Sequence, residues 1–493
     1  MQAAYYNTMA YSNDNGGSFT QQPLTGPTFL REDPYISVGA NGTSYAINGA
    51  CFLPTVACQV SKSSNGGTNW SFATPYDDNS TVWSYQNGTT VPPCNTSGSL
   101  LVDYAKITAD SHTSSPNANY VYVLGHFVVG AGCSMVVAGV ARSTDGGNTW
   151  GLHRIISLPI AGWGAWENLV IGSDGTLYYA TVDTNLYLVY STDAGSTWSF
   201  SKDTLNLTNA VQRVPLAIAS NSTIYFAVST SGITGHYQIY LIKTSNRGTS
   251  FSAPVAISDA SSNPFGFTGR NWIAPTITVN PVNSNVFVAW RDWRNSVNDT
   301  QIDVYAYSSL IGRSNLRLTP VTGYCRTLNY PGSNTTGANA NCNQGNDYLG
   351  SASNNYSDFV IYGIDYNAYS SNPTVTQTVS RLTIPRISAN PSTVILNCSR
   401  GKHQCPSSNS TVTLTGYPTG TTAAISYGCV SSCTNNPFLT GPSTVSVTGP
   451  AVSFVVTAKA PSRPVAGTWT LTVTAVDGSI NLTTQIQVQV ILS

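Results

Sequence analysis

The stretch Ser143-Thr-Asp-Gly-Gly-Asn-Thr-Trp150 is one of five copies of an eight-residue pattern in this chain. Each copy has Ser or Thr first, Asp or Asn third, Gly fifth, and Trp or Phe eighth. The hydroxyl and the Asp or Asn side chain can hydrogen-bond nearby backbone, Gly accepts a positive φ, and the aromatic ring can anchor the turn in an apolar seam. Five copies in one register predict a repeat architecture. The pattern positions, copy by copy, are Ser12, Asp14, Gly16 and Phe19; Ser63, Asn65, Gly67 and Trp70; Ser143, Asp145, Gly147 and Trp150; Ser191, Asp193, Gly195 and Trp198; Thr244, Asn246, Gly248 and Phe251.

This pattern resembles the Asp-box, or BNR repeat, of the sialidase superfamily. The resemblance covers about residues 1–384 and implies an all-β fold, the β-propeller. It implies little about activity, because the box is a structural turn and holds no catalytic group.

A second unit recurs between the boxes: two apolar strands joined by a polar turn, the alternation expected of antiparallel blades. It predicts a six-bladed propeller in which the N-terminal strands around Ala4–Thr20 complete the last blade. A seventh blade would form if residues 364–384 made a strand pair of their own. A degenerate box is expected near Ser308. The strand pairs begin near Asp33, Tyr104, Glu167, Arg213, Ala274 and Asp347.

The composition is polar but nearly uncharged. Lys and Arg total 21 and Asp and Glu total 21, so the net charge is zero and only 9% of the 493 residues are charged, against about 25% in ordinary soluble proteins. This excludes an electrostatic case for nucleic acid or an anionic membrane. It resembles surface proteins of acidophilic archaea, with few carboxylates to protonate in acid. No cofactor, metal site or membrane span is expected, since the five His lack metal-binding spacing and the longest apolar stretch, residues 127–140, is too short for a bilayer.

The ten cysteines indicate disulfides and an extracellular protein. Their spacing groups Cys51 with Cys58, Cys94 with Cys133 and Cys325 with Cys342, and leaves open the pairing among Cys398, Cys405, Cys429 and Cys433. No signal peptide is visible at the N-terminus, which indicates a mature or trimmed form. We expect glycans at several Asn-x-Ser/Thr sequons. The thirteen sequons begin at Asn41, Asn69, Asn79, Asn87, Asn95, Asn206, Asn221, Asn298, Asn334, Asn355, Asn397, Asn409 and Asn481.

Residues 385–493 differ from the preceding part of the chain. They lack boxes and show alternating strands, as in Gly467-Thr-Trp-Thr-Leu-Thr-Val473. About 110 residues of such strands predict one β-sandwich. It resembles the Ig-like modules of bacterial and archaeal surface proteins, although the Cys…Trp…Cys core signature is absent.

Ligands of a propeller meet its axis where the innermost strands begin. Sialidases hold a substrate carboxylate with three Arg and use a Tyr–Glu pair and an Asp acid, so the resemblance makes Arg213, Arg270, Glu167, Tyr348 and Asp33 the catalytic candidates. The family's Phe/Tyr-Arg-Ile-Pro motif is missing from Leu30-Arg-Glu-Asp-Pro34, and the chain has only two Glu. A structural role is therefore the competing interpretation. The binding candidates are Glu32, Asp33, Glu167, Arg213, Arg270, Trp272 and Tyr348.

Two further charged stretches are interpreted structurally. Asp77-Asp78 is expected in a solvated loop, and Arg291-Asp-Trp-Arg294 is expected to form an ion cluster at a blade edge.

Two functions follow. The first is a secreted, glycosylated, non-catalytic propeller at the cell surface, with glycans or surface proteins as partners and assembly through the Ig-like domain. The alternative is a sialidase-like glycoside hydrolase. The missing motif and the scarcity of Glu favour the first.

Overall fold

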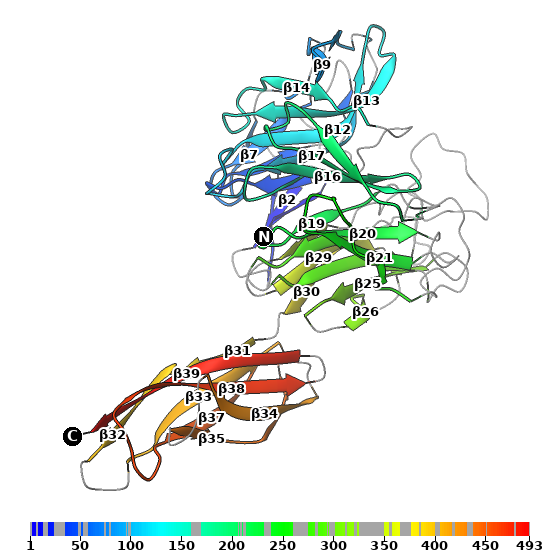
Figure 1. Cartoon of the computed structure of the whole chain (residues 1–493). Helices are drawn as coiled ribbons and strands as arrows, with labels where there is room; N and C mark the ends of the chain where they lie inside the picture. The colour runs from blue at the N-terminus through cyan, green and yellow to red at the C-terminus, as the bar shows by residue number, and fades with distance from the viewer. Residues whose placement is uncertain are drawn as a thin grey trace. The chain divides into compact units, whose positions relative to one another are not determined.

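A computed structural model gives the fold of the chain, and all of its described secondary structure is strand (Figure 1). The structure describes residues 2–5, 8–12, 18–23, 35–47, 51–52, 58–72, 75–77, 80–94, 96, 100–158, 169–205, 207, 210, 213–230, 238–259, 275–281, 284–292, 294, 301–310, 313–319, 323–324, 350–353, 357–364, 376–383, 386–399, 405–416, 420–430, 437–449, 451–477 and 480–492. Within these residues, no helix is long and apolar enough to cross a membrane.

The chain divides into two compact units. The first comprises Met1–Tyr307, Ser314–Asn355 and Phe359–Arg381. The second comprises Ser308–Arg313, Tyr356–Asp358 and Leu382–Ser493.

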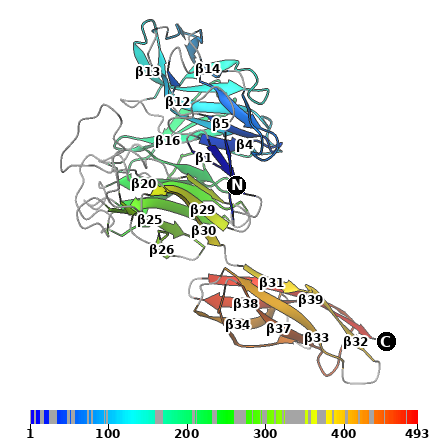
Figure 2. The ribbon, with the colours of Figure 1, turned by 180° about the vertical axis from the view of Figure 1, so that it is seen from behind.

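The described strands of the first unit form seven sheets, in which strands that follow one another in the chain mostly pair side by side (Figure 2). The first three sheets contain β1 (Gln2–Tyr5), β2 (Thr8–Tyr11) and β3 (Thr20–Pro23); β4 (Tyr35–Val38), β5 (Ser44–Ile47), β7 (Val60–Ser63) and β8 (Ser71–Phe72); and β6 (Cys51–Phe52), β11 (Leu100–Ala109), β12 (Val121–Val129), β13 (Met135–Ser143), β14 (Leu152–Ile155), β9 (Trp83–Tyr85) and β10 (Thr90–Val91).

The remaining four sheets of this unit have three to five strands each. They contain β15 (Val170–Ile171), β16 (Leu177–Val182), β17 (Leu186–Ser191) and β18 (Ser199–Lys202); β19 (Leu216–Ile218), β20 (Ile224–Thr230), β21 (Gln238–Thr244) and β22 (Val255–Ala256); β23 (Thr276–Val279), β24 (Val286–Asp292), β25 (Gln301–Ser308), β26 (Arg313–Arg317) and β27 (Gly323–Tyr324); and β28 (Gly350–Ser353), β29 (Ser357–Ile364) and β30 (Thr376–Thr383).

Innermost strands of successive sheets lie side by side in chain order, which makes this unit a β-propeller. The backbone N–H of Ala109 in β11 donates to Oγ of Ser37 in β4 at 2.9 Å. The hydroxyl of Thr108 donates to the carbonyl of Leu169, just before β15, at 2.8 Å. Strand β15 contacts β19, β19 contacts β23, and β23 contacts β28.

Apolar side chains fill the space between successive sheets. One cluster joins Ile47 and Val60 of the second sheet to Ile107 and Val123 of the third. Central strands such as β24 are buried along their whole length, which is why they read as continuous apolar runs in the sequence.

The N-terminal strands differ from the predicted closure. In the described part of the chain, β1, β2 and β3 form one sheet, and β28, β29 and β30 form a separate sheet. Tyr5 and Thr8 face each other across a two-residue connection, so the N-terminus builds a hairpin of its own that the sequence analysis did not separate. Residues 376–383 supply the third strand of the last sheet, and they form no strand pair of their own.

Four of the five predicted box turns are described, and they share one hydrogen-bond pattern. In the copy at Ser143, the hydroxyl donates to Oδ1 of Asp145 at 2.7 Å and accepts the N–H of Gly147 at 2.8 Å. The N–H of Thr149 donates to Oδ1 of Asp145 at 2.9 Å. The copies at Ser63, Ser191 and Thr244 repeat these contacts. In the copy at Ser12, positions 13–17 lie outside the described residues.

Three of the four described boxes also contact the preceding sheet. Arg142 of β13 donates to the carbonyl of Ala194 in the next box at 2.7 Å. Ser201 of β18 donates to the carbonyl of Arg247 at 2.9 Å, and Lys62 of β7 donates to Asn148. The boxes therefore cap their own hairpins and also join neighbouring sheets.

The second unit consists of two sheets whose strands alternate between buried and exposed residues, as in β32. One sheet orders β31 (Arg386–Asn390), β33 (Ser408–Thr415), β37 (Ala451–Lys459) and β35 (Phe438–Thr440). The other orders β32 (Thr393–Cys398), β39 (Ile480–Leu492), β38 (Gly467–Asp477), β34 (Thr422–Cys429) and β36 (Thr444–Ser446). The pairing of β32 with β39 is parallel.

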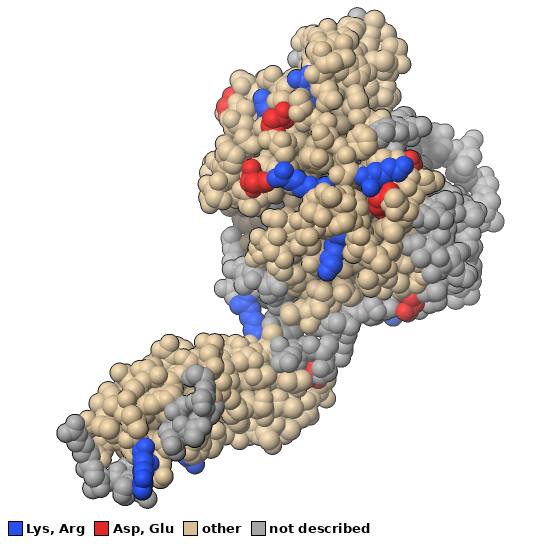
Figure 3. Space-filling model, in the orientation of Figure 1, with Lys and Arg blue, Asp and Glu red and all other residues tan. Residues whose placement is uncertain are grey.

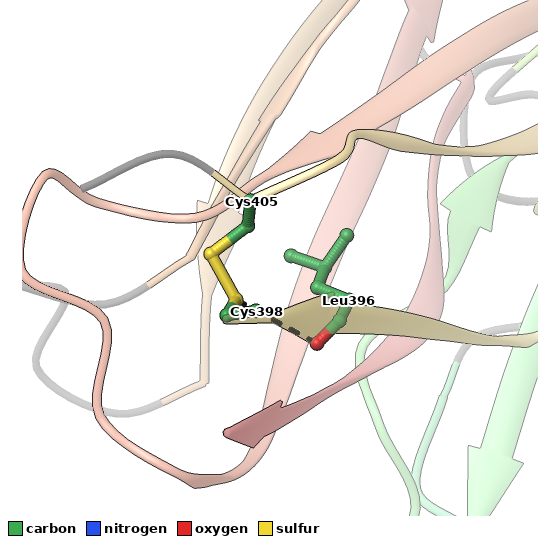
Figure 4. Close-up of a disulfide and its surroundings, with 3 residues drawn as sticks. All are labelled: Leu396, Cys398 and Cys405. Carbon is green, nitrogen blue, oxygen red and sulfur yellow. Dashed lines mark hydrogen bonds between the residues drawn. A yellow bond between two sulfur atoms is a disulfide. The ribbon is translucent and has the colours of Figure 1, made fainter. Parts of the chain in front are cut away.

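Disulfides are confirmed where the cysteines are described. Cys94 bonds Cys133, and Cys398 at the end of β32 bonds Cys405 (Figure 4). Cys58 and Cys429 are also disulfide-bonded, and none of the described cysteines is free. Cys325, Cys342 and Cys433 lie outside the described residues.

Candidate functional site

The inner strand β11 carries a bulge at Tyr104. Its pairing with β12 shifts register between Asp103 and Lys106, and Tyr104 has a positive φ of 53°. The backbone N–H of Tyr104 donates to Oδ1 of Asp103 at 3.0 Å. A Cβ on Gly125 of β12 would lie 2.8 Å from the Cα of Ala105, so the close approach requires glycine there. Bulges re-aim side chains and are common beside functional sites.

The ring of Tyr104 contacts two nitrogen-bearing side chains. The guanidinium carbon of Arg213, in the segment before β19, lies 5.3 Å from the ring centroid, within cation–π range. The ring of His126 in β12 meets it edge-on, with centroids 5.8 Å apart. Arg213 is 3% exposed and His126 is fully buried. Burying an Arg is costly unless its charge is compensated, and the face of Tyr104 supplies part of that compensation.

A second cation–aromatic pair lies on the adjoining inner strands. Nζ of Lys106 lies 5.0 Å from the ring centroid of Tyr35, the first residue of β4. Lys106 is 1% exposed although it is a lysine in a strand. Tyr35, Tyr104, Lys106, His126 and Arg213 are here called the inner-strand cluster.

The inner-strand cluster brings groups from three sheets to the end at which the inner strands begin. Arg presents a planar set of N–H donors that fits carboxylate and hydroxyl oxygens, and Lys adds a compact cation. Tyrosine rings offer an apolar face with a polar edge. Such a set can bind and orient a polar ligand, whereas proton transfer to a leaving group would need a carboxyl group beside it.

Of the residues that the sequence proposed for the site, only Arg213 is described, and it lies in the inner-strand cluster. Glu32, Asp33, Glu167, Arg270, Trp272 and Tyr348 lie outside the described residues, so their placement remains a prediction. In sequence, Asp33 is two residues from Tyr35, and Glu167 is two residues from Leu169.

The sequence analysis missed four members of the inner-strand cluster. Lys106 gave a signal, because a lone lysine interrupts the apolar strand Leu100–Ala109. Tyr104 was identified only as the start of a strand pair. His126 and Tyr35 gave no signal in the sequence, since nothing in a single sequence shows which residues of separate blades are in contact.

The other charged stretches have structural surroundings. Asp292 accepts hydrogen bonds from the indole of Trp290 and the guanidinium of Arg294, and Arg294 also pairs with Asp259. This confirms the predicted ion cluster but not its place at a blade edge, because Asp292 is fully buried in β24, which lies between β23 and β25. Asp77 is only 3% exposed, so its prediction as part of a solvated loop was wrong. Among residues that the structure describes, no group of three His, Cys, Asp or Glu could hold a metal ion.

Charged side chains are sparse on the face shown in Figure 3. Lys106 and Arg213 are buried cations in a chain of which 9% is charged.

Comparisons with known proteins give matches among solved structures alone. No protein-family model matches the chain, and no curated protein matches it. An exo-β-1,3-galactanase from Phanerochaete chrysosporium in complex with galactose is similar, with 13% identity, TM-score 0.36, and coverage of 94% of this chain and 90% of that chain. A GH43 protein from Bacillus licheniformis is similar with 9% identity and a TM-score of 0.32, and the match covers 92% of this chain and 88% of that chain. The exo-β-1,3-galactanase from Clostridium thermocellum is similar with 14% identity and a TM-score of 0.33, and the match covers 55% of this chain and 58% of that chain.

These neighbours are glycoside hydrolases, which overturns the prediction of a non-catalytic binding or assembly protein. The alternative, a glycoside hydrolase, agrees with them better. The prediction failed because it equated catalysis with the sialidase motif, whereas most glycoside hydrolases need a pair of carboxyl groups and no such motif. At these identities and TM-scores, the likeness says nothing about the substrate.

Proposed function

We propose that the first unit is a glycoside hydrolase whose substrate binds at the inner-strand cluster. The observation that carries the proposal is the presence of two cation–aromatic contacts of buried cations at the inner strands, Arg213 with Tyr104 and Lys106 with Tyr35. Aromatic faces suit the apolar faces of a sugar, and the nitrogen donors suit its oxygens.

The proposed roles follow the chemistry of glycoside hydrolysis. Such enzymes use two carboxyl groups, one to protonate the leaving oxygen and one as base or nucleophile. We assign these roles to Glu167 and Asp33, whose sequence neighbours Leu169 and Tyr35 adjoin β11. Arg213 and Tyr104 would orient the sugar.

The test is hydrolysis of aryl glycosides, including β-galactosides, β-xylosides and sialosides, from pH 2 to 8. Glu167→Gln and Asp33→Asn should each lower kcat at least about a hundredfold, with an unchanged Tm. Arg213→Lys should mainly raise KM. Asp259→Asn is the matched control, since its carboxylate is 56% exposed and pairs with Arg294 away from the cluster. Absence of turnover across the panel, or full activity of both carboxyl variants, would contradict the proposal.

We also infer the finer architecture. Seven described sheets favour seven blades, with the N-terminal hairpin in a blade of its own. Four repeated hydrogen-bond patterns favour true Asp-boxes at residues 1–384. The two-sheet second unit favours an Ig-like sandwich at residues 385–493, and the disulfides favour an extracellular protein. Glycans are its proposed partners.

A further inference from the structure

Four hairpin turns of the first unit share one five-residue conformation. In each, the first residue's N–H donates to the fifth residue's carbonyl at 2.8 or 2.9 Å, and the fourth residue's N–H donates back to the first residue's carbonyl at 2.9 or 3.0 Å. The fourth residue always has a positive φ, of 79°, 85°, 79° and 64° in chain order. The turns are Gly39–Thr43, Tyr85–Thr89, Gly172–Thr176 and Ala219–Thr223.

The third residue of each turn is Asn or Asp, and its side chain is fixed in the same way. Its Oδ1 accepts the N–H of the fifth residue, always Thr, at 3.0 to 3.1 Å. In three turns this residue is an exposed Asn, which makes residues three to five a sequon. In the fourth it is Asp174, which shows that the turn forms for structural reasons with or without a glycan acceptor.

We propose that Asn41, Asn87 and Asn221 carry N-linked glycans, selected from the sequons by this turn. The hydrogen bond uses only Oδ1, and no hydrogen bond of the three amide nitrogens is found among the described residues. In the transfer, the amide nitrogen forms a bond to the anomeric carbon of a sugar donor with a phosphate leaving group. The carbon–oxygen bond to phosphate breaks with its electron pair, and the nitrogen loses one proton to a base.

Four other sequons lie within the described residues, none of them in a five-residue turn, and the one at Asn481 lies in β39. The sequon at Asn69 lies within a box, where Trp70 is 8% exposed and Oγ of Ser71 donates to the carbonyl of Lys62 at 3.4 Å. Asn409 lies in β33, and its Oδ1 accepts the hydroxyl of Thr457 on β37 at 2.9 Å. Asn397 lies in β32 beside a disulfide-bonded cysteine. These sequons are expected to stay unmodified because they lie in strands or in a box and lack the five-residue turn, although Asn69, Asn397 and Asn409 are as exposed as the three proposed acceptors.

Two of the acceptors lie away from the inner-strand cluster. Asn41 follows the far end of β4, whose first residue is Tyr35, and Asn221 follows the far end of β19, which Arg213 precedes. Glycans on these turns project from the end of the inner strands opposite the cluster, so they would leave it uncovered.

Site-resolved glycopeptide mass spectrometry of the protein from its native source tests the proposal. Peptides with Asn41, Asn87 and Asn221 should carry glycan, and those with Asn69, Asn397 and Asn409 should not. Each of Asn41→Gln, Asn87→Gln and Asn221→Gln should remove one glycan from the intact mass, while the matched Asn69→Gln and Asn409→Gln change it only by the substitution. Unmodified turn sequons, or glycans on the strand and box sequons instead, would overturn it.

Discussion

The two ends of the inner strands are built differently. Because antiparallel strands alternate in direction, the boxes and the turns that begin at Gly39, Gly172 and Ala219 follow strands that run away from the starting end. At this far end, repeated turns satisfy their own polar groups, as Ser143 and Asp145 do. At the starting end, a bulge and buried cations from different sheets meet. The repeat thus builds the scaffold, and departures from the repeat mark the candidate site.

The largest loss of folding stability that we expect from one added methyl group is at the starting end. Gly125→Ala would place a Cβ 2.8 Å from the Cα of Ala105, and a backbone atom cannot move aside as a side chain can. Overpacking of this kind costs up to about 3 kcal/mol, and it should displace Tyr104 and raise KM. Gly151→Ala is the control, with no atom within 4 Å of its Cβ. Urea denaturation measures both, and equal stability of the two variants would remove the argument for a tightly held bulge.

At the far end, removal of the first hydroxyl of a box should destabilise the protein more than removal of a neighbouring side chain. Ser143 is fully buried and accepts the N–H of Gly147, so Ser143→Ala leaves that donor buried without its partner. The expected loss is about 1–3 kcal/mol. Thr144→Ala, an exposed position in the same box, should cost almost nothing. The urea denaturation midpoints of the two variants measure this difference. A loss of stability in Ser143→Ala no greater than that in Thr144→Ala would show that the hydroxyl does not stabilise the box turn.

Boxes with Asp and boxes with Asn should differ in acid. Burial alone would raise the pKa of Asp145, but hydrogen bonds from Thr149 and its neighbours lower that pKa to about 2. Asp193 has its pKa lowered by the same kind of contacts, against the effect of burial. A carboxyl group with a lowered pKa stabilises the fold above its unfolded pKa of about 3.9 and loses this effect as the pH falls through the folded value.

Asp145→Asn should therefore lower the Tm slightly at pH 5, and the difference should shrink towards zero between pH 4 and pH 2. Asn246→Ala serves as the comparison at a box that cannot titrate, and its Tm deficit should stay constant over the same range. If the Tm deficit of Asp145→Asn grew as the pH fell, the pH dependence would be opposite to the expected one and would contradict the lowered pKa of Asp145.

The same contrast explains what the sequence could and could not predict. The six strand pairs and the box turns could be read because their signals are local: alternation, a turn residue and a closing aromatic. The N-terminal hairpin was misplaced because nothing local tells whether Gln2–Tyr5 pairs with β2 or with a strand from the C-terminal side of the ring. Arg213 was identified from its place before a strand, whereas its contact with Tyr104 and the contact of Lys106 with Tyr35 arise only from non-local packing.

The smallest change in folding stability is expected from substitutions within the five-residue turns. Ser222 holds a positive φ of 64°, whereas its counterparts Gly42 and Gly88 hold 79° and 85° with glycine. A left-handed conformation costs an L-residue about 1–2 kcal/mol, and glycine costs about 0.5–1 kcal/mol in unfolded-chain entropy. Ser222→Gly should therefore stabilise the protein by roughly 0.5 kcal/mol, and the reciprocal Gly42→Ser should destabilise it by a similar amount. Both retain their sequons, so chemical denaturation of deglycosylated protein isolates the backbone effect. If Ser222→Gly were destabilising, the serine side chain would have to make a contact that outweighs its strain, and the four turns would not be equivalent.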